Sequence, residues 1–193
     1  MGYSDRSLVH VSELLAHIGR RAAAAGDGGS ALTPVQWSAL RYFSHANRFS
    51  RTPSAFARFR ATTRGTASAT ISGLVRAGYL ERRRRSEDGR GVHLTPTEAG
   101  ERLLQRDPLQ SMGRAIAQLA EEERSLAAAV PAIVGRMAGA DGGPAFGTCH
   151  DCRHLARANS GSAGAYYCTR EAAALSSAEL DGLCVRFEPA GSA

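Results

Sequence analysis

Apolar residues recur along the first part of the chain at helical spacing, and the breaks between these runs separate the predicted elements. A first helix is predicted over residues 5–25, and residues 26–30 interrupt it. Thr33 can cap a second helix that has Pro34 at its first position. The apolar stripe of the first helix is Leu8, Val11, Leu15 and Ile18. The second helix carries Val35, Trp37, Leu40 and Phe43, most of which we expect in the core.

The stretch from residue 51 to residue 95 has the pattern of a helix, a turn, a second helix and a hairpin. Its first apolar patch, which fits a short helix, is Phe56, Ala57 and Phe59. Thr62 or Thr63 can cap the helix that follows. That helix is predicted over residues 64–77 and ends before Gly78, because glycine suits the residue after a helix.

The second of these helices has one apolar face and one small polar face. Its apolar stripe is Ile71, Leu74 and Val75. Its other face carries Arg64, Thr66, Ser68, Ala69 and Ser72. Small side chains allow a helix to approach the DNA major groove closely, and hydroxyls can bind bases or phosphates. The pattern therefore indicates a DNA recognition helix.

A hairpin with four consecutive arginines follows. Residues 79–85 are predicted as a strand, residues 86–91 as a turn and residues 92–95 as the returning strand. Strand alternation divides the arginines into two pairs on opposite faces, so at least one pair must face solvent or a polyanion. One pair is Arg82 and Arg84, and the other is Arg83 and Arg85.

Positive charge is concentrated on this stretch. Residues 41–90 contain twelve arginines against three acidic residues, a charge of +9, while the whole chain carries +6. The remainder is therefore −3, a distribution expected of a protein with a phosphate-binding surface. A solvated basic face on a helical domain is the alternative. The coincidence with helix–turn–helix spacing favours DNA.

Two more helices and a linker follow the hairpin. Residues 97–119 are predicted helical, with a kink or break at Pro108. Residues 120–138 form a second helix with an acidic start, which Pro131 bends or interrupts. Glycine-rich residues 139–147 are predicted to be a linker.

Composition limits the classes of function. The 193 residues fit one medium domain and a small module. No apolar run is long enough to cross a membrane, and the first residues lack the apolar core of a signal peptide. We therefore expect a cytoplasmic protein. No nucleophile–base pair or phosphate-binding loop is evident, so we do not expect an enzyme.

Several segments, taken in order and spacing, resemble MarR-type winged-helix regulators. They are residues 32–40, 56–57, 71–80, 88–90 and 94–100. The resemblance covers Ser4 to about Ala138 and implies a mainly α (α+β) fold. In that fold a winged helix-turn-helix lobe at about residues 32–96 lies within a DNA-binding and dimerisation domain, residues 1–138. It also implies a homodimer whose two recognition helices bind a pseudo-palindromic site on double-stranded DNA.

The resemblance suggests a role for each basic or hydroxyl residue of the lobe. Residues expected in the major groove are Arg64, Thr66, Ser68 and Ser72. Phosphate contacts are expected from Arg82, Arg83, Arg84 and Arg85. Arg90, held by Asp88, is expected in the adjacent minor groove, so reversing its charge should lower DNA affinity strongly. Gly65 and Gly73 depart from a strong helix, since each costs about 1 kcal/mol relative to alanine.

All four cysteines lie in a C-terminal module, residues 148–190. They are Cys149, Cys152, Cys168 and Cys184, spaced C-x2-C-x15-C-x15-C. Four thiols in a small module of a cytoplasmic protein suit a zinc ion or an iron–sulfur cluster better than disulfides. His150 and His154 could replace a cysteine, but with four cysteines present we expect them in outer positions.

We favour a [4Fe-4S] cluster over zinc. A zinc ribbon usually has two close C-x2-C pairs, whereas here one pair is followed by two isolated cysteines. The module also resembles the small high-potential-type [4Fe-4S] modules found as minor subunits of glycyl-radical enzymes such as benzylsuccinate synthase. On this reading an apolar shell around the cluster consists of Leu155, Tyr166, Tyr167 and Phe187.

These features together predict a DNA-binding regulator, expected to repress, whose affinity changes when the cluster is oxidised, lost or nitrosylated. It would then sense redox state, oxygen or iron. One alternative is a MarR-type repressor that answers a small apolar or aromatic ligand and has a structural zinc-bound tail. Another is an electron-transfer or enzyme-accessory subunit, which would have no use for a winged helix.

Overall fold

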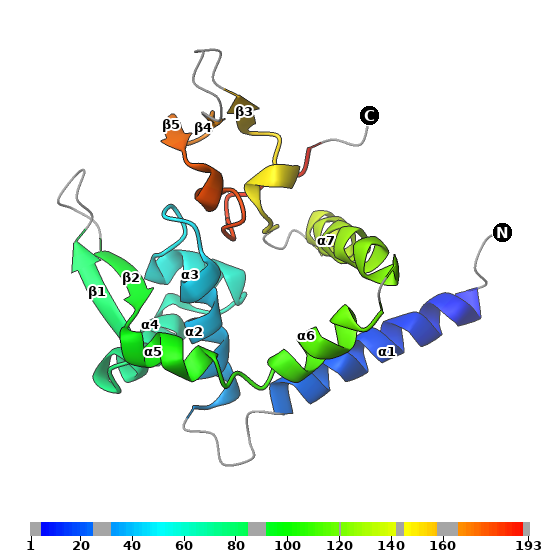
Figure 1. Ribbon diagram of the computed structural model, residues 1–193, viewed down its shortest axis with the longest axis horizontal. Coiled ribbons are helices and arrows are strands. Elements are labelled where there is room, and N and C mark those ends of the chain that lie inside the picture. Colours follow the sequence, from blue (N-terminus) through cyan, green and yellow to red (C-terminus); the bar gives the residue numbers. More distant parts are fainter. Residues whose placement is uncertain are drawn as a thin grey trace.

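The computed structural model describes residues 5–24, 32–84, 92–119, 121–141, 145–157 and 166–190. Its elements fall into three regions (Figure 1): a winged-helix lobe, a set of helices that extend away from it, and a small C-terminal unit next to α3. The helix-rich α+β class is as predicted. None of the described helices combines the length and apolar character needed to cross a membrane.

The lobe comprises four helices and a two-stranded wing. They are α2 (Pro34–His45), α3 (Pro53–Phe59), α4 (Arg64–Arg76), β1 (Leu80–Arg84), β2 (Val92–Pro96) and α5 (Glu98–Leu104). The predicted helix, turn, helix and hairpin are therefore confirmed. The turn predicted at the tip of the hairpin lies outside the described residues.

Each helix of the lobe begins at a threonine whose hydroxyl caps it. These hydroxyls accept backbone N–H groups of the first turn, and the four caps are Thr33, Thr52, Thr63 and Thr97. The caps at Thr33 and Thr63 were predicted. At Thr33 the bond is reciprocal, because Gln36 Oε1 accepts the Thr33 N–H at 2.9 Å. Four short helices thus start at defined residues, which fixes the orientation of α3 and α4.

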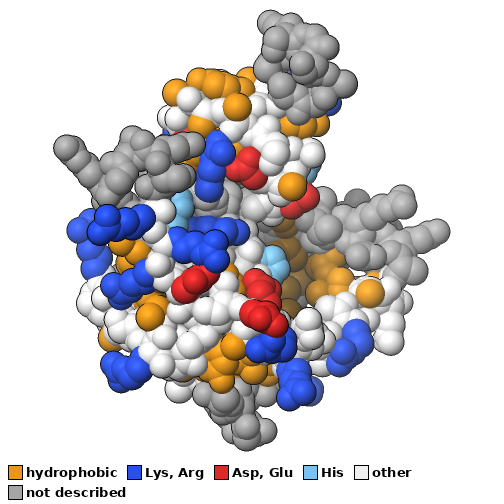
Figure 2. All heavy atoms as spheres, turned by 60° about the vertical axis from the view of Figure 1, so that its left-hand side comes forward, with side chains coloured by type: hydrophobic (Ala, Val, Ile, Leu, Met, Phe, Trp, Pro, Cys, Tyr) orange, Lys and Arg blue, Asp and Glu red, His pale blue; other side chains and the backbone are white. Residues whose placement is uncertain are grey.

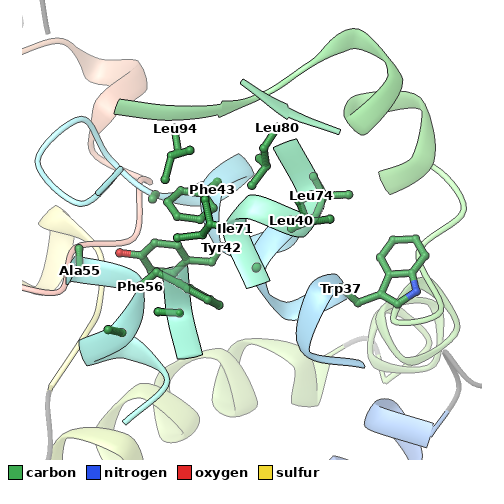
Figure 3. Packing of buried hydrophobic residues seen from close by; sticks show 14 of the residues in the cluster. Trp37, Leu40, Tyr42, Phe43, Ala55, Phe56, Ile71, Leu74, Leu80 and Leu94 are labelled. Atoms are coloured by element: carbon green, nitrogen blue, oxygen red, sulfur yellow. The ribbon is translucent and has the colours of Figure 1, made fainter. Parts of the chain in front are cut away.

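The core of the lobe lies between α2, α3, α4 and the wing (Figure 3). Its fully buried large side chains include Leu40, Phe43, Phe56, Ile71, Leu74, Leu80 and Leu94. Aromatic rings form its centre, with the Phe43 and Phe56 centroids 5.5 Å apart. Each such side chain contributes roughly 1.5–3 kcal/mol by leaving water. Val35 was expected in this core but is 36% exposed.

The wing packs on the core through alternate residues. Leu80 and Leu94 are buried, and Arg82 lies opposite Leu94 on the same face of the antiparallel pair. Before β1 the chain turns at Gly78, whose φ is +77°. After β2, a Cβ on Gly100 would lie 2.3 Å from a backbone oxygen, so only glycine fits where α5 passes this turn.

Three helices lie outside this core. They are α1 (Asp5–Ala24), α6 (Gln110–Ala117) and α7 (Glu121–Asp141). None of their residues whose exposure is described is buried. The predicted break at Pro108 is confirmed, since α5 ends at Leu104 and α6 begins at Gln110. Pro131, in contrast, lies inside α7 and does not interrupt it.

The C-terminal unit contains a small antiparallel sheet in the order β3–β4–β5. Its elements are η1 (Cys149–Asp151), β3 (Leu155–Arg157), β4 (Tyr166–Cys168), β5 (Ala173–Leu175) and η2 (Ser177–Glu179). Its own core is small and consists of Cys149, Leu175 and Leu180. The linker is shorter than predicted, because α7 runs to Asp141 and Gly147 already pairs with Cys184.

Candidate DNA-binding surface and cysteine pocket

The recognition helix α4 buries one side and leaves the other free. Ala67, Ile71 and Leu74 are buried, which holds α4 against α2 and α3. The residues predicted to enter the major groove are exposed or half-buried on the other side. They are Arg64, Thr66, Ser68 and Ser72. The Thr66 hydroxyl also lies 2.9 Å from that of Thr63, within the helix cap.

The two glycines of α4 have different surroundings. A Cβ on Gly73 would lie 3.3 Å from Nε2 of Gln36, so this glycine lets α4 pass close to α2. Gly65 is open to solvent, with no atom nearer than Thr63 Oγ1 at 3.9 Å. Nothing in the lobe explains the glycine at position 65.

The described arginines of the wing are all exposed. Arg82 reaches α4, where its guanidinium donates to the Ser72 hydroxyl at 3.4 Å. Arg83 lies on the other face and is bonded to Glu81 at 2.7 Å, while Arg84 is exposed at the end of β1. The predicted alternation thus leaves Arg82 and Arg84 on the face that carries the recognition helix. The other predicted wing residues, Arg85, Asp88 and Arg90, lie outside the described residues.

Figure 2, which brings the wing side of the molecule forward, shows basic side chains spread over this face of the lobe. Acidic side chains also lie on this face, among the basic ones. This surface combines the small exposed side chains of α4 with the guanidinium groups of the arginines around it. Such a surface can bind phosphates on both sides of a groove.

The four cysteines come from three separate segments, one of which supplies a pair, and all four line one pocket. They are Cys149, Cys152, Cys168 and Cys184, and all four are free thiols. The pocket is small, with a cavity volume of about 20 Å³. Asn47 and Phe49 of the lobe also line it. The pocket therefore spans both units of the protein.

The other three thiols affect the pKa of Cys149. Burial is the main cause, and the neighbouring thiolates of Cys184, Cys152 and Cys168 are further causes, of a Cys149 pKa raised to about 11. Burial also raises the pKa of Tyr42 in the lobe, and Cys184 adds to that effect. A cation bound among the thiols would reverse this repulsion.

The thiols do not have the close arrangement of a single-ion site. Zinc binds sulfur at about 2.3 Å, which places tetrahedral ligands within about 4 Å of one another. Among the described residues, no group of three or more histidine, cysteine or acidic side chains is arranged to hold one metal ion.

Both histidines of the unit lie beside carboxylates. His150 Nε2 is 3.0 Å from Asp181. His154 lines the cysteine pocket, and its Nε2 is 3.1 Å from Glu188, without the angle of a regular hydrogen bond. The His154 contact is the first cause, and Arg170 a further one, of the lowered pKa of Glu188.

The expected apolar shell forms only in part. Leu155 and Tyr166 pack against the small core of the unit, and Phe187 is buried against Gly147. Tyr167 is 36% exposed and lies away from this core, because strand alternation turns it outward.

The C-terminal unit is attached to the lobe at the turn between α2 and α3. Leu183 pairs there with Ala46: its N–H donates to the His45 carbonyl at 2.8 Å, and its carbonyl accepts the Asn47 N–H at 2.9 Å. Arg48 donates to the carbonyl of Ala174. The attachment is thus mostly backbone hydrogen bonding.

Val185 completes the attachment from the C-terminal side. It is 4% exposed and belongs to the core of the lobe, although it follows Cys184 directly. Its N–H donates to Ser50 Oγ at 3.2 Å. The sequence gives no periodic signal for this contact, because Val185 lies in a short irregular segment.

Comparisons with known proteins agree with this fold. Residues 32–91 match the model of the MarR family. No curated protein matches the chain. FabT from Streptococcus pneumoniae, solved in complex with DNA, is 21% identical, with 70% of this chain and 96% of its own covered and a TM-score of 0.52. MarR from E. coli in its apo form is 19% identical, with 69% and 99% covered and a TM-score of 0.47.

A variant of MepR from S. aureus is similar to the same degree, at 20% identity with 66% and 93% covered and a TM-score of 0.49. The likeness to FabT shows the winged-helix fold. The family match over residues 32–91 coincides with the winged-helix lobe without β2 and α5.

Proposed function

We propose that this protein is a homodimeric DNA-binding regulator, expected to repress, that acts in the cytoplasm and whose affinity depends on a [4Fe-4S] cluster held by its four cysteines. The observation that carries the proposal is the shared pocket. Four thiols from three segments line it together with Asn47 and Phe49 of the lobe, next to the turn from which α3 starts. The cluster would serve as a redox, oxygen or iron sensor.

DNA binding is supported by the exposed face of α4 and the arginines beside it. Arg64 and Ser68 are exposed, and Arg82 lies on the same face of the wing. Guanidinium groups bind phosphate, or guanine, through two hydrogen bonds. The FabT structure contains DNA, and we extend that partner to this chain.

Homodimer formation is supported by apolar side chains left exposed on the helices outside the core. On α1 they are Leu8, Val9, Val11, Leu14, Leu15 and Ile18. On α7 they are Val130, Ile133 and Met137. A row of large apolar side chains on exposed helices marks an interaction surface. A second copy of the chain would cover it and carry a second recognition helix for a pseudo-palindromic site.

The residues of the pocket fit a sulfur-ligated group. Cysteine thiolates are the usual ligands of both zinc and [4Fe-4S] clusters. The cysteine spacing favours the cluster, because a zinc ribbon usually has two close C-x2-C pairs, whereas this unit has one pair and two isolated cysteines. Cys149, Cys152, Cys168 and Cys184 would hold it. When bound, such a cluster supplies a centre whose charge and occupancy change with the redox conditions.

A short series of hydrogen-bonded residues connects this pocket to the proposed DNA-binding surface. Cys184 is followed by Val185, whose N–H is bonded to Ser50. The Ser50 carbonyl accepts the N–H of Thr52, which caps α3. A rearrangement around Cys184 would therefore shift α3, on which α4 packs. In a dimer this would change the spacing of the two recognition helices and hence the affinity for two half-sites.

The decisive test begins with anaerobic purification of the full chain and analysis of iron, sulfide and zinc. About four irons and four sulfides per chain with a brown colour are expected. A duplex selected from random double-stranded DNA then serves as a probe in anisotropy titrations with and without the cluster. We expect the affinity to differ between the two forms, and Arg64→Glu to abolish binding, while the matched change Arg157→Glu on β3 leaves it intact.

Each other result overturns part of the proposal. Failure to select any duplex would favour an electron-transfer or accessory subunit. One zinc per chain without colour would make the C-terminal unit structural. Equal DNA affinity with and without a bound cluster would remove its sensing role while leaving the regulator.

A second candidate is a regulator that answers a small ligand, with zinc in the cysteine pocket. It is favoured by a cleft of about 520 Å³ between α2 and the segment that joins α5 to α6. Arg41 and Asp107, paired at 2.8 Å, line this cleft together with Leu104 and Leu109. A cleft of this size accepts a drug-sized molecule. This candidate becomes the better one if zinc is found.

A further inference from the structure

The turn between α2 and α3 contains two buried polar side chains with different surroundings. Asn47 is 5% exposed and Ser50 is fully buried. Ser50 Oγ accepts the N–H of Val185, so its polar group is satisfied. Both polar atoms of the Asn47 amide, Nδ2 and Oδ1, are buried without a hydrogen-bond partner among the described residues. Burying an amide without a hydrogen-bond partner destabilises the folded protein. The Asn47 amide therefore requires a partner.

The place of Asn47 limits what that partner can be. Its backbone N–H is bonded to Leu183, and a Cβ on Gly182 would lie 2.9 Å from its Cβ. The side chain is therefore held between the lobe and the C-terminal unit. Asn47 lines the pocket that the four cysteines share. A group bound by those cysteines lies within the same small space.

The other hydrogen-bonding side chains around the pocket already have partners. Arg186 is bonded to Glu171 at 2.6 Å, and Arg170 is paired with Glu188. His154 lies 3.1 Å from the same Glu188 carboxylate. The Asn47 amide differs from these side chains, because it has no charged partner and neither of its polar atoms is hydrogen-bonded to a described residue.

We propose that the side-chain amide of Asn47 donates a hydrogen bond to a sulfur atom of the group held by the four cysteines, either a cysteine thiolate or a sulfide. The inference rests on the proposed function, because it requires that the cysteines hold such a group. An amide nitrogen has two N–H donors, and an anionic sulfur accepts them. Hydrogen bonds to the ligating sulfurs orient the ligands and tune the centre.

This bond would make Asn47 a positioning residue between the bound group and the DNA surface. Further along the same turn, Arg51 accepts the N–H of Leu94 in the wing at 2.9 Å. Thr52, the next residue, caps α3. A gain or loss of the hydrogen bond at Asn47 therefore acts on the one segment that contacts the wing, α3 and the cysteine pocket together.

The test compares Asn47→Asp and Asn47→Ala with Ser50→Ala in the full chain loaded with the cluster. Asp keeps the shape of Asn but loses both N–H donors, whereas Ser50→Ala weakens the same turn without touching the pocket lining. The measurements are the visible absorption spectrum, the rate of iron release to a chelator, and the melting temperature with and without the cluster. If the wild type carries zinc, zinc release is followed instead.

We expect Asn47→Asp and Asn47→Ala to release the metal about tenfold faster than the wild type, as for lost outer-sphere bonds, and to change the spectrum. Ser50→Ala should release metal at the wild-type rate, although its melting temperature falls in both forms. Wild-type release rates in both Asn47 variants, or equal destabilisation with and without the group, would show that the amide serves the fold alone. A wild type that holds neither iron, sulfide nor zinc would instead overturn the proposed function, and this inference with it.

Discussion

The winged-helix lobe and the C-terminal unit are both small, yet they are stabilised in different ways. Sixteen buried apolar residues form the described core of the lobe, and three form that of the C-terminal unit. The lobe also begins each helix at a threonine cap. The C-terminal unit relies on hydrogen bonds to the lobe. Units of this size usually need a metal or a partner to fold, so we expect the unit to depend on the lobe and on the group proposed to bind its cysteines.

Removing a large side chain from the core of the lobe should have the largest effect. Phe43→Ala deletes a fully buried ring and should lower the free energy of unfolding by about 3–5 kcal/mol. Denaturant unfolding followed by circular dichroism measures this loss, and DNA binding should fail with it. The paired change is Leu180→Ala in the C-terminal unit, where we expect loss of metal with the lobe still folded and bound to DNA. Loss of DNA affinity in Leu180→Ala equal to that in Phe43→Ala would contradict a separate core in each region.

Forcing the two regions apart should have a smaller effect. In Gly182→Ala the new Cβ would meet Cβ of Asn47 at 2.9 Å and its Cα at 3.1 Å, which should cost about 1–3 kcal/mol. Limited proteolysis should then cut the C-terminal unit sooner, while the lobe keeps its resistance. Gly139→Ala is the matched control, because a Cβ there meets nothing within 4 Å. Equal protease resistance in the two variants would show that the contact at Gly182 is not needed for attachment.

The ion pair that joins the regions should matter least. Arg48 and Glu179 lie 3.3 Å apart and are both partly exposed, so Glu179→Gln should cost less than about 1 kcal/mol. Burial works to raise the pKa of Glu179, but hydrogen bonds from Ser176 and the charge of Arg48 outweigh it and lower the pKa below the usual 4.5.

A lowered carboxyl pKa in the folded state stabilises the protein above the usual pKa, and the benefit is lost as the pH falls through the lowered value. Thermal unfolding of wild type and Glu179→Gln should therefore differ slightly at pH 7 and converge below pH 4.5. A difference that persists in acid would mean that Glu179 acts through packing instead of charge.

The lobe could be predicted from local signals. Thr33 with Pro34 gives the start of α2, and Gly78 gives the end of α4, because caps and glycines act within a few residues of their position. The strand pattern likewise predicted the pairing of β1 with β2. Such signals can be recognised in the sequence because the residues that produce them also form the helix end or the strand.

The attachment of the C-terminal unit could not be predicted in this way. Leu183 bonds to His45, far away in the sequence, through backbone groups that every residue has. Asn47 lies in a turn, where asparagine is common for local reasons, so its burial beside the cysteines gave no signal. The cysteine spacing predicted a shared site, and the four cysteines do line one pocket. The spacing contained no information about which part of the lobe would complete that pocket.

The burial of Val185 in the lobe also has a consequence for how the chain is made. The lobe is encoded early, and its own residues can begin to pack as soon as they leave the ribosome. Its core, however, includes a side chain that is synthesised about ninety residues after Leu94. Contacts across such a distance form slowly. The lobe therefore reaches its final packing only after the cysteines have been translated, so a nascent chain cannot complete the core of its winged-helix lobe before its cysteine pocket exists.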